Sequence, residues 1–204
     1  MSHLGRRLAV ALAISAPCAA LALFAQARYC PPRGCAVTPS ARALDALKNR
    51  TTTPDDADFD RRATLGALAA AGDDRARWSE SRAAAFEGYV VSVERGGVES
   101  ANCFSLTRRD VHIHVAARPD APPTETVVVE VSPRFMDAAR ARGDDWSLAA
   151  LRRALVGHRC RFEGWLLFDR EHAGESENTA PGNPVDWRAT AWELHPVSRI
   201  EIVN

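Results

Sequence analysis

The chain has 204 residues and a mass of 22.2 kDa, enough for one full domain with appendages and too little for two large domains. Hydrophobic residues make up 46% and charged residues 25% of the sequence, which argues against wholesale disorder. The formal net charge is zero, and this argues against a dedicated binder of duplex DNA, because such proteins neutralise phosphates with an excess of basic residues.

The first 27 residues have the pattern of a targeting segment. Arg6 and Arg7 give a positive start, residues 8–24 are uncharged and largely apolar, and Ala25-Gln26-Ala27 is the small-x-small pattern that signal peptidases accept. We expect a cleaved signal peptide, with an uncleaved inner-membrane anchor at residues 8–24 as the alternative. The rest of the chain is then exported, as a periplasmic or secreted protein or an anchored one.

Four cysteines follow this segment, namely Cys30, Cys35, Cys103 and Cys160. An even number of cysteines in an oxidising compartment is compatible with two disulfides, for which three connectivities exist. Cys30 and Cys35 bracket a short Pro-Pro-Arg-Gly loop and are candidates for one bond, Cys103 and Cys160 are candidates for a second, and the connectivity stays open. The alternative for Cys160 is a small buried hydrophobic residue.

Residues 28–84 do not have the pattern of an independent domain. Helices are predicted at 41–48 and 58–71, and a third is possible at 75–85, but large apolar residues are sparse in all of them. A Thr-Thr-Thr-Pro-Asp-Asp stretch at 51–56 separates the first two helices. We therefore expect helices that lie against the following domain, or a loose spacer.

Residues 85–204 have mainly the two-residue period of β-strands. Strands are predicted at 86–94, 111–116, 127–131, 159–168 and 187–195, with a continuation of the last one at 199–203. One substantial helix is predicted between the third and fourth strands, from Asp144-Asp145 to a stop at Gly157, with leucines at 148, 151 and 155. This order is that of an OB-fold, a five-stranded barrel that binds ligands on the face of strands 2 and 3 and through the 1–2 and 4–5 loops. A small β-sandwich and another open α+β sheet are the alternatives.

Two strings in this region are distinctive, Gly164-Trp165-Leu166-Leu167-Phe168-Asp169 and Trp192-Glu193-Leu194-His195-Pro196-Val197. Together with 86–90, 102–103, 110–113 and 129–134, they resemble a group of exported bacterial proteins of uncharacterised function with an OB-like domain. The resemblance covers residues 85–204. It implies an OB-like fold and export, and it supplies no catalytic residues.

The second strand carries the clearest chemical pattern. Asp110, His112 and His114 alternate with Val111, Ile113 and Val115, so the polar side chains share one face and the apolar ones share the other. In a barrel the apolar face is the core, and the histidine face lies outside. His112 and His114 can place two imidazoles on a divalent metal such as zinc. The alternative is a pair of solvated or hydrogen-bonded histidines.

Further candidates lie on later segments. Glu193 and His195 share a face of the fifth strand, as an acid–base pair, as two metal ligands, or as a simple hydrogen-bonded pair. Glu130 lies on the third strand. Glu171 and His172 open a long polar 4–5 loop at 169–186, and loops of this length are usually functional or disordered. The start of that loop weakly resembles the metal-and-base loop of His-Asn-His endonucleases, without the strand–strand–helix context of those enzymes.

We therefore predict an exported OB-like binding module for an unknown ligand and favour a non-enzymatic role. The candidate ligand-binding residues are Asp110, His112, His114, Glu130, Glu171, His172, Glu193 and His195. The alternative is a metal-dependent hydrolase, such as a nuclease, built from the same histidines and glutamates, in which His112 must lie near His172 or His195. Nucleic acid is a disfavoured partner, because Glu163 and Glu193 interrupt the aromatic and basic residues of the barrel. Membrane contact is expected only through an uncleaved N-terminal segment, and the oligomeric state is open.

Overall fold

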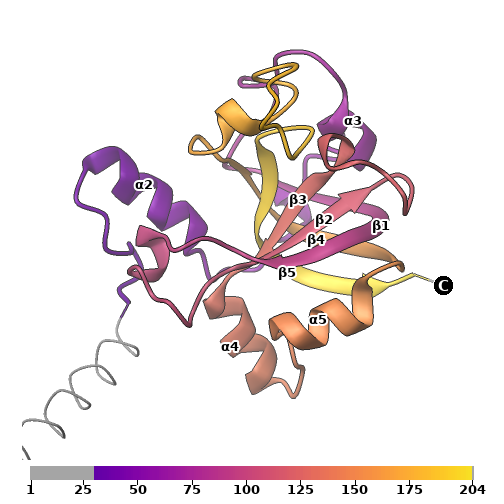
Figure 1. Cartoon of the computed structure of the whole chain (residues 1–204). Coiled ribbons are helices and arrows are strands. Elements are labelled where there is room, and N and C mark those ends of the chain that lie inside the picture. The colour runs from indigo at the N-terminus through magenta and orange to yellow at the C-terminus, as the bar shows by residue number, and fades with distance from the viewer. Residues whose placement is uncertain (1–29, 204) are drawn as a thin grey trace, which may run out of the picture.

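The computed structural model describes residues 30–203 of the chain (Figure 1). The predicted targeting segment at 1–27 lies outside these residues. No helix in the described range is long and apolar enough to cross a membrane. The α-helices and strands of the described residues are, in chain order, α2 (Pro39–Lys48), α3 (Leu65–Ala69), β1 (Ala83–Arg95), β2 (Val111–Ala116), β3 (Val127–Val131), α4 (Pro133–Ala141), α5 (Leu148–Leu155), β4 (Arg159–Phe168) and β5 (Trp192–Ile202).

The five strands close into a barrel with the order β1-β2-β3-β5-β4, and β4 pairs back onto β1. All neighbours are antiparallel except β3 and β5, which run parallel. The long strand β1 pairs with β4 through its first half and with β2 through its second half, so one strand closes the barrel. The predicted mainly-β, OB-like barrel is therefore confirmed.

The barrel interior is filled by the alternating apolar residues of the strands. Val111, Ile113 and Val115 of β2 face inward, as their spacing predicts, and are at most 2% exposed. They pack with the inward residues of β3, β4 and β5 and with one face of α4 and α5. The opposite face of β2 and β3 is consequently available for polar side chains.

Two helices, rather than the one predicted, separate β3 from β4, and both lie below the barrel in Figure 1. Helix α5 ends at Leu155, and Gly157 follows with a φ of 82°, as its predicted role as a stop requires. Helix α4 was not predicted. It begins with Pro133 in its first turn behind the N-cap Ser132, whose hydroxyl accepts from the backbone N–H of Phe135.

The segment before the barrel is less helical than predicted. The helix at 41–48 is present as α2, but the predicted helix at 58–71 shrinks to α3, whose N-cap is Thr64. The possible helix at 75–85 is absent, and residues from Ala83 onward belong to β1. Three consecutive alanines favour a helix by intrinsic propensity, and pairing with β4 overrides this preference.

Strand β5 begins later than predicted and has no break. It runs from Trp192 through the cis peptide bond between His195 and Pro196 to Ile202. Residues 187–191, predicted as strand, belong instead to the loop between β4 and β5. This loop therefore spans 169–191, and in Figure 1 it covers the upper end of the barrel.

The disulfide in the described residues joins Cys35 to Cys103, so neither candidate pairing, Cys30–Cys35 or Cys103–Cys160, is present in the structure. Cys160 lies in the barrel core and is fully buried, as the alternative for this residue anticipated. Cys103 lies in the loop between β1 and β2, outside the barrel, and this separation prevents a bond to Cys160.

Candidate functional site

The outer face of β2, β3 and β5 carries a cluster of buried ionisable side chains. Asp110, Glu130, Glu193 and His195 are each at most 1% exposed, although none of them faces the barrel interior. Glu130, Glu193 and His195 occupy polar positions that alternate with apolar ones on β3 and β5, and Asp110 directly precedes β2. The sequence predicted this face correctly, but it is covered in the structure and does not lie open to solvent.

The loop at 169–191 provides part of this cover. The ring of Trp187 stacks on His112 at a centroid distance of 6.4 Å and approaches His114 at 5.5 Å and His172 at 5.4 Å. The guanidinium of Arg188 lies over the same indole, 5.0 Å from its centroid. One aromatic side chain thus closes the histidine face of β2.

Helix α2 and the loop between β1 and β2 complete the cover. Lys48, at the end of α2, is 2% exposed, and its Nζ lies 2.6 Å from Glu99 Oε2. Glu171, which is 55% exposed, lies 3.8 Å from the same ammonium group. Asn102 reaches in from the β1–β2 loop and donates from Nδ2 to Asp110 Oδ2 at 2.8 Å.

Glu130 is the centre of the cluster. Its Oε1 lies 3.1 Å from His112 Nε2, and its Oε2 lies 3.0 Å from His195 Nδ1. The register of β2 and β3 places His112 directly opposite Glu130. His195 comes from β5, the other neighbour of β3, so one carboxylate bridges histidines from the strands on both sides.

A second chain of ion pairs runs from β5 into the loop. Glu193 Oε1 accepts from His195 Nδ1 at 3.1 Å, and its Oε2 accepts from Arg188 at 2.7 Å. Arg188 also lies 3.3 Å from Asp169 Oδ2, and that oxygen is 2.5 Å from His172 Nδ1. His172 is 30% exposed, so the chain of ion pairs connects the buried cluster with the surface.

The acidic groups outnumber the permanent cations in this cluster. Two fixed positive charges, Lys48 and Arg188, face five carboxylates, those of Glu99, Asp110, Glu130, Asp169 and Glu193. Buried charges must be paired, because the loss of hydration is costly. The remaining negative charge of the cluster is therefore compensated by protons on the histidines or by a bound cation.

Protonated histidines can complete this charge balance. Burial alone would lower the pKa of His112, but Glu130 outweighs it and raises this pKa to about 9. Burial likewise opposes charge on His195, yet Glu130 and Glu193 hold the pKa of His195 well above its usual range. Asp110 differs, because burial dominates and raises the pKa of this carboxyl to about 7.

Four ligand-type atoms of this cluster are buried and have no hydrogen-bond partner among residues 30–203. They are Asp110 Oδ1, His112 Nε2, Glu130 Oε2 and His195 Nε2. Two of them lie at ion-pair distance from another group, but the donor directions are poorly aligned for a hydrogen bond. Unpartnered buried polar atoms are uncommon in folded proteins and demand an explanation.

These atoms belong to residues that are close enough to share a metal ion. Asp110, Glu130 and His195 each offer a ligand atom within 4.8 Å of the other two, and so do Glu99, His112 and Glu130. On a tetrahedral zinc ion the ligand atoms lie about 3.4 Å apart, so the side chains of either set would move closer together on binding one. Glu130 is common to both sets.

His114 lies apart from both sets, although His112 and His114 were predicted to share a metal. Its Nδ1 is hydrogen-bonded to Thr126 Oγ1 at 3.1 Å, and burial lowers the pKa of His114 to about 4. The carboxylate opposite His112 on β3 is Glu130, whereas Val128 is opposite His114. The two histidines thus share a face of the sheet but have different surroundings.

The remaining predicted residues do converge. His112, Glu130 and His195 are in direct contact, Glu193 contacts His195, and Asp110 completes the set. His172 joins through the pairs with Asp169 and Arg188, and Glu171 joins through Lys48. His112 therefore lies near His195, as the enzymatic alternative required.

Lys48, Asp169, Arg188 and Asn102 were not predicted as site residues. Lys48 is the single lysine in the chain, which was a visible signal, but nothing in the sequence connects α2 with β5. Arg188 follows Trp187 in a stretch predicted as strand, where a charge is expected to be solvated.

No family model, curated protein or solved structure matches the chain. The site must therefore be interpreted from its own geometry.

Proposed function

We propose that the protein is an exported OB-like binding module whose ligand is a divalent transition-metal ion, held on the outer face of β2, β3 and β5. The ligands in this proposal are Asp110, Glu130 and His195, and His112 contacts the shared carboxylate of Glu130 from the neighbouring set. The observation that supports it most strongly is that each of the three ligands carries a buried ligand atom without a hydrogen-bond partner among residues 30–203.

The neighbours of these residues orient them as they are oriented in metal sites. Asn102 fixes one oxygen of Asp110 and leaves Oδ1 unpartnered. Glu193 and Glu130 both contact Nδ1 of His195, and Nε2 of the same ring is unpartnered. A histidine that ligates a metal through one nitrogen usually donates its other N–H to a carboxylate, and Glu193 is that carboxylate here. Arg188 in turn fixes Glu193.

Ligand type and charge define the class of ion. Mixed imidazole and carboxylate ligands favour zinc and its divalent first-row neighbours over calcium and magnesium, which prefer oxygen alone. A dication would compensate most of the negative charge of the carboxylates that Lys48 and Arg188 do not neutralise. Glu99 is the weakest candidate ligand, because its carboxylate already pairs with Lys48.

A metal-dependent hydrolase is the second candidate, and the pair of Asp169 and His172 favours it. This pair lies at the solvent-facing end of the cluster, and His172 is the most exposed of the histidines that take part in it. A carboxylate that orients an imidazole next to a metal is a general-base arrangement. Substrate turnover that depends on His172 and on metal would favour the hydrolase over the binding module.

The decisive experiment is metal analysis of the protein purified without chelators, together with zinc and manganese titrations. We expect one equivalent of metal in the wild type. Glu130→Gln and Asp110→Asn keep the shape of the side chain and remove its charge. Each should weaken metal affinity by at least about 100-fold, since both remove ligands rather than outer residues, for which 10- to 100-fold is typical.

His158→Ala is the matched control, because His158 is exposed and lies in the turn before β4. Its metal content should equal that of the wild type. Thermal unfolding of each apo variant shows whether it remains folded. A wild type that neither contains nor takes up metal contradicts the proposal, as does a folded Glu130→Gln variant with full metal content.

A further inference from the structure

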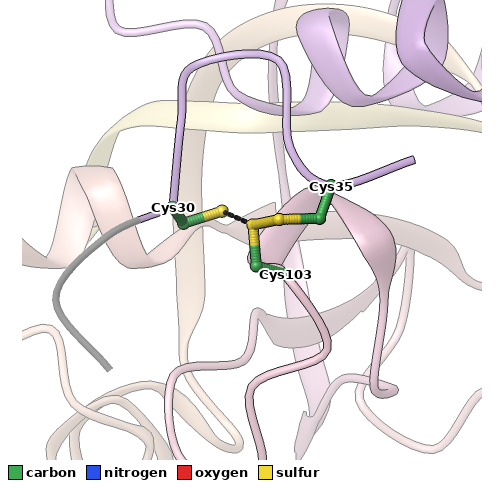
Figure 2. A group of neighbouring side chains, drawn as sticks. All are labelled: Cys30, Cys35 and Cys103. Atoms are coloured by element: carbon green, nitrogen blue, oxygen red, sulfur yellow. Dashed lines mark hydrogen bonds between the residues drawn. A yellow bond between two sulfur atoms is a disulfide. The ribbon is translucent and has the colours of Figure 1, made fainter. Parts of the chain in front are cut away.

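Three cysteine sulfurs meet beside the barrel, and none of them belongs to the proposed metal site. Cys103 is bonded to Cys35, and the Sγ of Cys30 lies 2.6 Å from the Sγ of Cys103 (Figure 2). Figure 2 shows the sulfurs in a row with Cys103 in the middle. A free thiol against one sulfur of a disulfide is the arrangement from which thiol–disulfide exchange proceeds.

The surrounding backbone holds the three cysteines together from two sides. Cys35 donates its N–H to Ser100 O at 2.8 Å, and Gly34, with a φ of 62°, donates to Pro31 O in the turn between Cys30 and Cys35. Arg134 of α4 donates to the carbonyl oxygens of Cys30 and Pro31 at 3.0 and 2.8 Å. The approach of Cys30 to the disulfide is therefore anchored by hydrogen bonds.

Cys103 has an unusual backbone for a residue with a side chain. It and Phe104 have φ values of 51° and 56°, in the left-handed region that favours glycine. Hydrogen bonds from their N–H groups to Ser100 O and Glu99 O hold this conformation. Strained residues of this kind are concentrated at functional positions.

We propose that Cys103 is the shared partner in a thiol–disulfide exchange between Cys35 and Cys30. The thiol of Cys30 loses its proton to solvent, and its sulfur attacks Cys103 Sγ. The Cys30–Cys103 bond forms while the Cys35–Cys103 bond breaks, and the electron pair of the broken bond leaves on Cys35 Sγ, which takes up a proton. One disulfide and one thiol are present before and after, so no oxidant or reductant is needed.

The exchange changes the exposure of the free thiol. Cys30 is half-buried and donates to Ala101 O at 3.2 Å, whereas Cys35 is exposed. In the exchanged state the chain therefore presents a reactive thiol at its surface, which is available for modification. In the original state the free thiol is shielded.

The exchange is expected to be slow at neutral pH and faster in base. Burial raises the pKa of Cys30, as does the charge of Asp45, while Arg134 and Arg108 oppose this rise. Because the thiolate is the attacking species, the rate should rise up to about tenfold per pH unit below that pKa.

Alkylation followed by peptide mapping without reduction tests this proposal. The folded protein is treated with N-ethylmaleimide for increasing times, unfolded in acid and digested, and each modified cysteine is identified by mass spectrometry. We expect molecules labelled at Cys30 and molecules labelled at Cys35, with the Cys35 fraction growing with time and pH. Cys160 is the internal control, because burial raises its pKa to about 11 and should keep it unlabelled until unfolding.

Two variants separate exchange from misfolding. Cys30→Ser should retain the Cys35–Cys103 bond and lose all labelling at Cys35. Cys35→Ser should form the Cys30–Cys103 bond and keep its thermal stability. Labelling confined to Cys30 at every time and pH overturns the proposal, and so does a folded Cys35→Ser variant in which Cys30 and Cys103 are both free.

Discussion

Arg188 is the residue on which the pairing of charges in the buried cluster most depends. Its guanidinium is fully buried and contacts Asp169 and Glu193, and Glu193 in turn contacts His195. Burial would lower its pKa, but Glu193 and Asp169 raise the pKa of Arg188 above its already high ordinary value. It therefore stays charged and links the loop at 169–191 to β5.

Replacing Arg188 by methionine should lower the free energy of unfolding by about 3–5 kcal/mol, because two carboxylates lose a buried partner. Urea unfolding measures this loss. Arg62→Met is the control, since Arg62 pairs with Asp60 at the surface and is 83% exposed, and it should leave stability within experimental error. An equal loss of unfolding free energy in the two variants would show that the ion pairs of Arg188 do not stabilise the cluster.

The pair of Asp169 and His172 should make stability depend on pH. Asp169 accepts from His172, and this raises the pKa of His172 above its ordinary 6.5 against the effect of partial burial. A histidine with a raised pKa stabilises the fold fully below about pH 6.5, its unfolded value, and this contribution disappears as pH rises through the folded pKa.

The His172→Gln variant isolates this contribution. The difference in unfolding free energy between wild type and variant should be on the order of 1 kcal/mol larger at about pH 5.5 than at about pH 8.5. Chemical denaturation at both pH values measures it. A difference that does not change with pH would mean that His172 is uncharged in the folded protein.

At the scale of elements, Gly164 is a point of close backbone approach between β4 and β5. A Cβ at this position would lie 2.7 Å from Pro196 O and 2.9 Å from Val197 Cα, and both are backbone atoms that cannot turn away. The register of the two strands shifts at the same point. A side chain here would force the strands apart next to His195, a proposed metal ligand.

Gly164→Ala should therefore cost about 1–3 kcal/mol of stability by overpacking. Gly66→Ala is the matched control, because a Cβ there meets nothing within 4 Å and α3 should gain up to about 1 kcal/mol in helix propensity. Thermal or urea unfolding compares the two variants. A stable Gly164→Ala protein would contradict the tight contact between β4 and β5.

The elements that could be predicted from sequence were those with a strong local pattern. The bounds of β2, β3 and β4 follow directly from alternating apolar residues, and the end of α5 follows from its leucines and Gly157. Helix α4 was missed, although Ser132-Pro133 is a helix-start signal, because arginines and alanines obscure its apolar face. The start of β1 was missed because alanines have no strand preference of their own.

At the scale of the whole molecule, the sequence was sufficient to predict the barrel and to name most residues of the candidate site. It was not sufficient to predict that other segments cover these residues and bury them. Trp187 covers the histidine face from 73 residues beyond His114, and Lys48 reaches the same cluster from α2. Such contacts between distant segments depend on the conformations of the loops, which cannot be predicted from the local periodicity of apolar residues. The outer face therefore had to be seen in three dimensions to be recognised as buried.

The central claim is that the unpartnered atoms of Asp110, Glu130 and His195 hold a metal ion, and its location can be measured directly. Crystals of the zinc-loaded protein, with anomalous data collected on both sides of the zinc absorption edge, show where the ion is bound. We predict one strong anomalous peak within about 2.0–2.2 Å of ligand atoms from these residues. A peak at the cysteines or on the surface alone, or no peak in this cluster, would contradict the account.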